Sequence, residues 1–220
     1  MIKKSGLKVL GTSSLFVAVA FSTSIAQAQT DPVTPPHGQV YVKDITYGGS
    51  GCPQGSVGVS VADSGLNFGV SFDEYIAGIG PDFSRADKRK SCDLRVNLHV
   101  PSGYSYTIAD VNYRGYADLD RGIIGKFKTN YRFQGERLEA GFVQSTRGPV
   151  SEDIMVSDSL DLEAFVWSAC GATAPVVLQT KLQLAKTRMA ASDAGGVLGV
   201  DSIEGKLTHQ YSLVWRRCNN

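Results

Sequence analysis

The sequence has little that would identify an enzyme. It contains only three histidines among 220 residues, and it lacks a Gly-x-Ser-x-Gly nucleophile elbow, a His-Glu-x-x-His helix and a P-loop. These motifs mark serine hydrolases, zinc peptidases and nucleotide-binding enzymes, so none of those classes is indicated. A catalytic site would have to be assembled from scattered residues, and we expect neither a cofactor nor a metal.

Long apolar runs are missing after the N-terminus. Met1 to Lys8 carries three lysines and no acidic residue, an apolar stretch follows from Val9 to Ile25, and Ala26-Gln27-Ala28 offers the small residues that a signal peptidase reads. This order predicts a secretory signal peptide over residues 1–28. No later stretch is long enough for a transmembrane segment. We therefore expect a protein that is secreted, or lies in the periplasm or at the cell surface, after cleavage.

Neither basic nor acidic residues are in large excess. Three of the 22 basic residues lie in the predicted signal, so 19 remain in the mature chain against 21 acidic ones, a formal net charge of −2. Nucleic acid requires a strong positive field, so it is not an expected partner, and an anionic membrane surface is not indicated. The one dense basic run, Arg85 to Lys90, is interpreted as a solvated loop.

A polar, proline-rich segment separates the signal from the rest of the chain. Gln29 to His37 contains Pro32, Pro35 and Pro36. Such a composition is typical of a linker without a fold of its own. We expect a flexible tether over residues 29–37 and one domain over residues 38–220, a length that suits a single core.

Alternation with a period of two dominates this domain. From Asp93 to Val100 every second residue is apolar, which is typical of a strand with one buried face. Frequent turn residues separate such segments and predict a single antiparallel β-sandwich, of which the jelly roll is one form. Helix is expected only as one turn over Asp73–Ile79 and a short segment over Leu184–Ser192. The other expected strands span Val40–Thr46, Ser56–Ala62, Leu66–Phe72, Tyr104–Tyr113, Ile123–Phe133, Glu139–Thr146, Leu160–Trp167, Leu178–Leu184 and Leu207–Trp215.

The four cysteines all follow the signal, and they allow three pairings: Cys52, Cys92, Cys170 and Cys218. Trp167 and Trp215 each precede a cysteine by three residues, at the end of an apolar strand. If those strands are neighbours, Cys170 meets Cys218, and Cys52 is left for Cys92. The alternative is a zinc site, which lacks the expected Cys-x-x-Cys spacing here. We therefore predict disulfides Cys52–Cys92 and Cys170–Cys218.

Several short motifs occur in a fixed order, and together they resemble a known family. They are Tyr47-Gly48-Gly49-Ser50-Gly51-Cys52-Pro53, Val70-Ser71-Phe72-Asp73, Lys90-Ser91-Cys92-Asp93-Leu94, Pro101-Ser102-Gly103-Tyr104, Tyr113-Arg114-Gly115-Tyr116-Ala117, Trp167-Ser168-Ala169-Cys170 and Trp215-Arg216-Arg217-Cys218. The set resembles the small secreted four-cysteine proteins catalogued as domain of unknown function 4360, which occur in fungi and bacteria. The resemblance implies a secreted, disulfide-bonded, β-rich domain and supplies no catalytic residues.

The titratable residues favour structural interpretations. His37 lies in the tether, His99 lies on the polar face of its strand, and His209 shares a face with Leu207 and Trp215 that should be buried. A buried histidine is more often a core residue than a base or ligand. Two acidic groups are candidates for calcium, but we interpret them as solvated, turn-forming faces. They are Asp118 with Asp120, and Asp158, Asp161 and Glu163 near Glu152 and Asp153.

Tyrosine and arginine gather in the middle of the chain. Exposed aromatic rings stack on sugars or proteins, and arginine forks its hydrogen bonds, so such clusters favour recognition. The alternative is that the tyrosines only fill the rim of the sandwich. The expected contact surface consists of Tyr113, Arg114, Tyr116, Tyr131 and Arg132, with Gly115 permitting a bulge that turns its neighbours outward.

The sequence thus favours a secreted or envelope-associated, non-catalytic binding or structural module. Its partner would be an extracellular carbohydrate or protein whose identity the sequence does not reveal. The alternative is a secreted hydrolase that acts on polysaccharide or peptide through a dispersed active site. A groove holding paired carboxylates would favour the hydrolase.

Overall fold

The computed structural model describes residues 33–135, 137, 140–159, 167–171, 175–200 and 209–218. Within these ranges every regular element is a β-strand. The strands are β1 (Tyr41–Gly48), β2 (Val57–Val61), β3 (Asn67–Phe72), β4 (Ile76–Ile79), β5 (Arg89–His99), β6 (Tyr104–Leu119), β7 (Ile123–Phe133), β8 (Ala140–Arg147), β9 (Val150–Ser159), β10 (Val176–Lys186), β11 (Gly196–Gly199) and β12 (His209–Arg217). The predicted signal peptide and the expected strand Leu160–Trp167, except for Trp167, lie outside the described residues.

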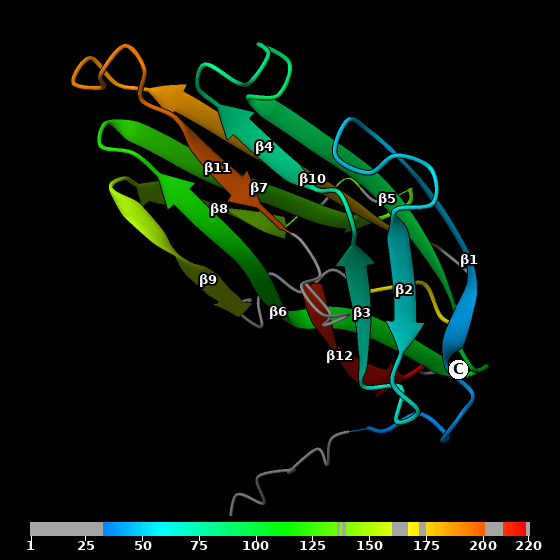
Figure 1. The fold of residues 1–220 in the computed structure, drawn as a ribbon. Helices are drawn as coiled ribbons and strands as arrows, with labels where there is room; N and C mark the ends of the chain where they lie inside the picture. The colour runs from blue at the N-terminus through cyan, green and yellow to red at the C-terminus, as the bar shows by residue number, and fades with distance from the viewer. Residues whose placement is uncertain are drawn as a thin grey trace, which may run out of the picture. The chain divides into compact units, whose positions relative to one another are not determined.

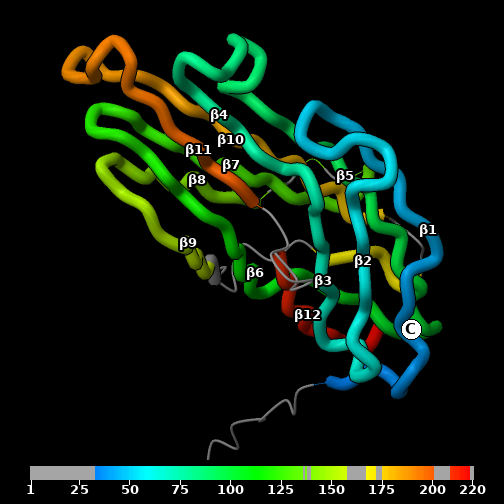
Figure 2. The backbone as a smooth tube through the Cα atoms, viewed as in Figure 1, coloured from blue at the N-terminus to red at the C-terminus, as the bar shows by residue number. Residues whose placement is uncertain are grey.

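The strands form two antiparallel sheets that lie one behind the other (Figure 1). The five-stranded sheet has the order β1-β5-β10-β7-β8, and the seven-stranded sheet has the order β2-β3-β12-β6-β11-β4, with β9 also paired to β6. One edge of β6 pairs first with β12 and then with β11, while the other edge pairs with β9. The hairpins β2–β3 and β7–β8 can be followed along the chain in Figure 2. The predicted β-sandwich with two disulfides is confirmed.

The core lies between the sheets and follows the alternation in the sequence. On β5, Leu94, Val96 and Leu98 are buried, while Asp93 and Arg95 are exposed on the opposite face. Burial of large apolar side chains is the main stabilising term in such a fold. The largest fully buried side chains are Tyr75, Tyr106, Tyr211, Phe68, Phe72, Ile79, Leu94, Leu98, Ile108, Leu119, Ile123 and Leu178.

Both expected helices are wrong. Ile76–Ile79 forms β4, whose backbone pairs with β11 from Gly196↔Ile79 to Gly199↔Ile76. Strand β10 continues to Lys186, and a turn follows in which Ala190 N donates to Thr187 O at 3.2 Å. In the first segment, pairing with a strand that is distant in the sequence outweighs the helical preference that the sequence suggested. In the second, the strand continues and a local turn ends it. Strands β9 and β11 were not expected.

Both predicted disulfides are present, Cys52–Cys92 and Cys170–Cys218. The expected reason for the second, that the strand Leu160–Trp167 neighbours Leu207–Trp215, falls largely outside the described residues. Among the described residues, the segments that carry Cys170 and Cys218 each form backbone hydrogen bonds to the start of β6, and the Arg216 guanidinium lies over the Trp167 ring at 4.4 Å. Gly171 N donates to Tyr104 O at 2.9 Å, and Cys218 N donates to Gly103 O at 2.8 Å. The bridge therefore joins two chain segments that both contact this end of β6.

The described part of the expected tether packs against the domain. Val33 forms an isolated antiparallel bridge with Trp215. Pro35 is buried, while Pro36 and His37 are exposed. Ordered contacts therefore begin before Gly38, inside the segment that composition alone assigned to a linker.

Candidate functional site

Tyr113 and Tyr131 point into the core, so the expectation that they lie on the surface is wrong. Tyr113 on β6 is 2% exposed and Tyr131 on β7 is 6% exposed. The Tyr113 ring packs edge-on against His209 at 4.6 Å, and its hydroxyl donates to Thr129 Oγ1 at 3.4 Å. Strand alternation accounts for their position, because both follow the inward parity of their strands.

Arg114 and Tyr116 lie on the outer face of the seven-stranded sheet. The Arg114 side chain is exposed, and the Tyr116 hydroxyl shares a hydrogen bond of 2.8 Å with Ser151 Oγ on β9. The expected bulge at Gly115 is absent, because the β6–β9 register runs unbroken past it. Gly115 has another role: a Cβ there would lie 2.4 Å from Gly199 O, so the residue permits the close approach of β11.

Arg132 lies on the outer face of the other sheet, away from Arg114. Across β10 it stands in register with Val177 and then with Arg95 of β5. The three residues line a hollow of about 400 Å³ together with Thr46, Tyr47, Gly48, Asp93 and Gln179. Within the described part of the chain, neither the Arg95 nor the Arg132 guanidinium has a hydrogen-bond or ion-pair partner. Both fork-shaped donor groups are therefore free to bind a ligand.

The polar groups beside this hollow are held in fixed positions. Gln179 Nε2 donates to Asp93 Oδ1 at 2.9 Å, and Asn97 Nδ2 donates to Asp44 Oδ2 at 2.8 Å. Both acids accept hydrogen bonds from amides and are not in ion pairs with arginine. At the end of the same face, the rings of Tyr41 and His99 stack at 4.7 Å, and Tyr41 remains 49% exposed.

Basic side chains follow the outer face of the five-stranded sheet, a feature that the sequence analysis missed. Strand register places them on one side: Arg89 and Arg95 of β5, Lys181 of β10, Lys126, Lys128 and Arg132 of β7, and Arg147 of β8. Asp44 and Asp93 are the acids that share this face among the described residues. We refer to these seven basic residues as the basic face. The alternation in Lys126-Phe127-Lys128 could have indicated that two lysines lie on the outer face of one strand.

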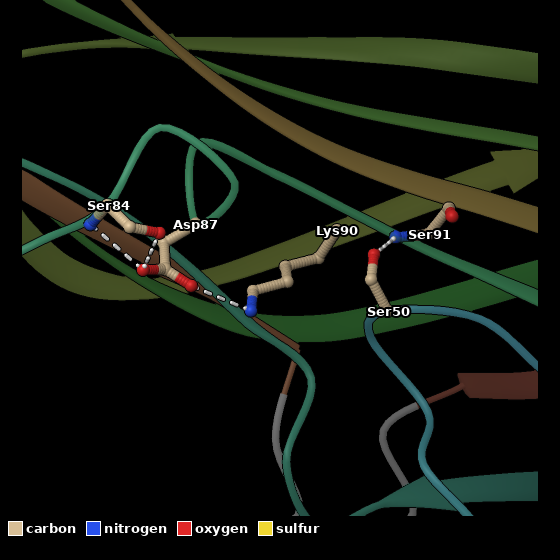
Figure 3. Close-up of polar contacts among 5 residues, drawn as sticks. All are labelled: Ser50, Ser84, Asp87, Lys90 and Ser91. Carbon is tan, nitrogen blue, oxygen red and sulfur yellow. Dashed lines mark hydrogen bonds and ion pairs between the residues drawn. The ribbon is translucent and has the colours of Figure 1, made fainter.

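An ion pair between Asp87 and Lys90 links the loop before β5 to the first residues of that strand. Ser84 donates from its hydroxyl and backbone nitrogen to Asp87 Oδ2 at 2.6 and 3.0 Å, and Lys90 Nζ donates to Asp87 Oδ1 at 2.9 Å (Figure 3). These bonds from Ser84 and Lys90 lower the pKa of Asp87 to about 2. The run interpreted as a loop is partly strand, since Arg89 and Lys90 belong to β5. Lys90 stands opposite the buried Leu182 of β10, so its side chain lies on the other side of the sheet from the basic face.

An acidic hollow of about 490 Å³ lies beside β4 and β11, and Asp82, Asp118, Asp120 and Asp193 line it. Asp120 Oδ2 accepts a hydrogen bond from Gly195 N at 2.7 Å, which fixes the turn before β11. Among the described residues, no group of three or more histidines, cysteines and acids is arranged to hold a metal. Asp161 and Glu163 of the second acidic group lie outside the described residues.

The prediction that His209 is buried is confirmed. Its ring is fully enclosed by Phe72, Tyr113, Phe127 and Tyr211, with ring centroids between 4.6 and 6.3 Å away. Desolvation lowers the pKa of His209 to about 3. The side chain is therefore neutral at physiological pH and is not exposed to solvent.

The fold and its surface define a disulfide-bonded antiparallel β-sandwich with polar outer faces. No helix in the described ranges has the length and hydrophobicity to cross a membrane. Residues 38–218 match the family described as Domain of unknown function (DUF4360), and the chain belongs to that family. An "Uncharacterized secreted protein" of Arthroderma benhamiae is 32% identical over 186 residues, which are 84% of this chain and 75% of the relative. The resemblance found in the sequence is thus confirmed.

Solved structures give only distant likenesses. The structure of TmCBM61 in complex with beta-1,4-galactotriose aligns with 80% of this chain and 90% of its own, at 13% identity and a TM-score of 0.28. A structure of infectious bursal disease virus, Gx strain, aligns with 83% of this chain and 38% of its own, at 10% identity and a TM-score of 0.28. Likenesses at this level carry no argument about the ligand.

Proposed function

We propose that the mature protein is a non-catalytic extracellular module that binds a carbohydrate or protein through the outer face of its five-stranded sheet. An extracellular location is supported by the two disulfides, which persist in oxidising compartments. The signal-like N-terminus and the printed name of the fungal relative agree with it.

The observation that carries the proposal is the hollow between Arg95 and Arg132. Both arginines project from paired strands, so the backbone that positions them is fixed, and the ordering cost on binding falls on the two side chains. Their guanidinium groups are free, and the adjacent Gln179–Asp93 pair presents further polar atoms. A surface of this kind recognises hydroxyl or carboxylate groups by hydrogen bonding.

A glycan array and a pull-down with the purified mature protein would identify ligands. Arg132→Ala should then weaken binding by about tenfold, which corresponds to losing one charge-assisted hydrogen-bonding group. Arg114→Ala is the matched control, because it removes an exposed strand arginine from the other sheet. A loss of binding with Arg114→Ala and not with Arg132→Ala would assign the site to the seven-stranded sheet. A mature protein without any ligand in either screen would overturn the proposal.

The acidic hollow favours a second candidate function, a hydrolase that acts on polysaccharide or peptide. A glycosidase needs two carboxyl groups within one cleft, and Asp118 lines this hollow together with Asp82 and Asp193. Hydrolysis of polysaccharide or peptide by the mature protein, abolished in Asp118→Asn with the fold intact, would establish this function. Release of no product from ligands that the protein binds would exclude it.

A further inference from the structure

We propose that the basic face binds an anionic polysaccharide, a linear glycan that carries carboxylate or sulfate groups along its length. The inference rests on the proposed function and adds the chemical class of the ligand. It starts from the sorting of charge between the two outer faces. The basic face carries seven cations and two acids, whereas the outer face of the seven-stranded sheet carries Asp110, Asp118 and Asp153 with Arg114 and Arg216.

The cations are held close together at a cost in stability. Lys181 of β10 and Lys128 of β7 are direct cross-strand partners, and Lys126 follows two residues from Lys128 on the same face. Like charges directly opposite each other destabilise a sheet. Within the described ranges, none of the three ammonium groups has an ion-pair or hydrogen-bond partner. An external anion bound across these three lysines would offset their mutual repulsion.

The layout of the cations fits an extended polymer. They follow neighbouring strands that are about 4.8 Å apart, and successive outward residues on one strand are about 7 Å apart. Strand β5 alone has 11 residues, so the face extends for about 35 Å along it. A chain with a regularly repeated negative charge can contact several of these residues at once, and the weak single contacts then add up.

The remaining side chains of this face distinguish a glycan from other polyanions. Asp93 and Gln179 provide acceptors and donors for sugar hydroxyl groups, and the exposed Tyr41 ring offers a stacking surface. Insertion into an anionic membrane needs protruding apolar groups, and the exposed large hydrophobic residues described on this face are Tyr41 and Val143.

The test compares ligands that differ only in charge. Affinity electrophoresis of the mature protein through polygalacturonate should retard it, and the fully methyl-esterified polymer, which is neutral, should not. Chondroitin sulfate provides the sulfated case. Retardation should fall as salt is raised, because exposed charges are screened. Single-stranded DNA and vesicles of anionic phospholipid serve as the competing polyanions.

The matched variants place the site. The triple substitution Lys126→Gln, Lys128→Gln and Lys181→Gln should weaken binding to the anionic glycan about tenfold, from three exposed contacts. The control substitutes Arg85, Arg121 and Arg188 by Gln, which removes the same charge from exposed positions off this face, and it should change binding less than twofold. Circular dichroism checks that both variants are folded.

Each other outcome overturns the inference. An equal loss in the control variant would show that net charge alone acts. Absence of binding to both anionic glycans, or tighter binding to DNA or vesicles, would exclude this ligand class. If the protein binds a neutral glycan or a protein through Arg132 instead, the proposed function stands and only this inference fails. If no ligand of any kind is bound, both fail.

Discussion

Lys181 and Lys128 lie directly opposite each other on the outer face of the five-stranded sheet, as partners in the β10–β7 ladder. This pairing predicts opposite effects on stability and binding. Lys128→Glu should stabilise the fold by about 0.2–1 kcal/mol, because an opposite-charge pair replaces a repulsive one. The same change should weaken binding to an anionic glycan. Thermal unfolding and affinity electrophoresis measure the two effects.

Lys128→Gln separates the two contributions. It removes the repulsion without adding an attraction, so its melting temperature should lie between those of the wild type and Lys128→Glu. A lower melting temperature for Lys128→Glu than for the wild type would contradict the prediction and would show that Lys128 is stabilised by its surroundings.

The Cys170–Cys218 bridge should be a major contribution to stability. Cys218→Ala is expected to lower the free energy of unfolding by about 2–5 kcal/mol, the usual range for a native disulfide in a small exported domain. Urea unfolding without reductant measures it. The double variant Cys170→Ala, Cys218→Ala should match the single variant, because both lose the same bond. A single variant as stable as the wild type would contradict the prediction.

Gly115 is expected to be intolerant of any side chain. Gly115→Ala would bring a Cβ to 2.4 Å from the Gly199 carbonyl oxygen, so β6 and β11 would have to separate. The expected loss of stability is about 1–3 kcal/mol, the range for overpacking. Gly48→Ala is the control, since its Cβ would meet no atom within 4 Å and its φ is not in the left-handed region. Similar melting temperatures for the two variants would refute this account.

Alternation in the sequence was enough to predict the sandwich and the burial of His209, because both depend on local parity along a strand. The same alternation also places Tyr113 and Tyr131 on the buried faces of their strands. The expectation that they lie on the surface came from the residue type and not from this alternation. Strand β11 could not be predicted, because its four residues include Gly196 and Gly199 and its pairing partners are distant in the chain.

The basic face could not be recognised from composition. The mature chain is nearly neutral, so the net charge conceals how the charges are sorted. Lys128 and Lys181 are 53 positions apart, and only the register of β7 with β10 brings them together. Register depends on pairing across the whole sheet. The disulfide pairing was predicted correctly from the Trp-x-x-Cys repeat, and among the described residues both segments also form hydrogen bonds to the start of β6.

His209 should make the stability of the protein depend on pH in a defined window. Burial among Phe72, Phe127, Tyr113 and Tyr211 lowers its pKa to about 3, below the ordinary value of 6.5. The two tyrosines stay neutral in acid, and burial raises the pKa of Tyr211 further. Below pH 6.5 the unfolded chain binds a proton at this residue and the folded chain does not. The contribution of neutral His209 to the free energy of unfolding is therefore complete above pH 6.5 and is lost as the pH falls towards 3.

The size of this loss and its origin can both be measured. Unfolding free energy should fall by about 1.4 kcal/mol for each pH unit below 6.5 through this one group.

His209→Phe fills the same aromatic cage without a titrating nitrogen, so its stability should change less between pH 6.5 and 4.5. The difference between the wild-type and His209→Phe curves removes the effect of acids that titrate in both proteins. One of these is Asp87, whose lowered pKa affects stability only at more acidic pH. Parallel curves for the wild type and His209→Phe would mean that the folded protein accepts a proton on His209, and the buried neutral state would be wrong.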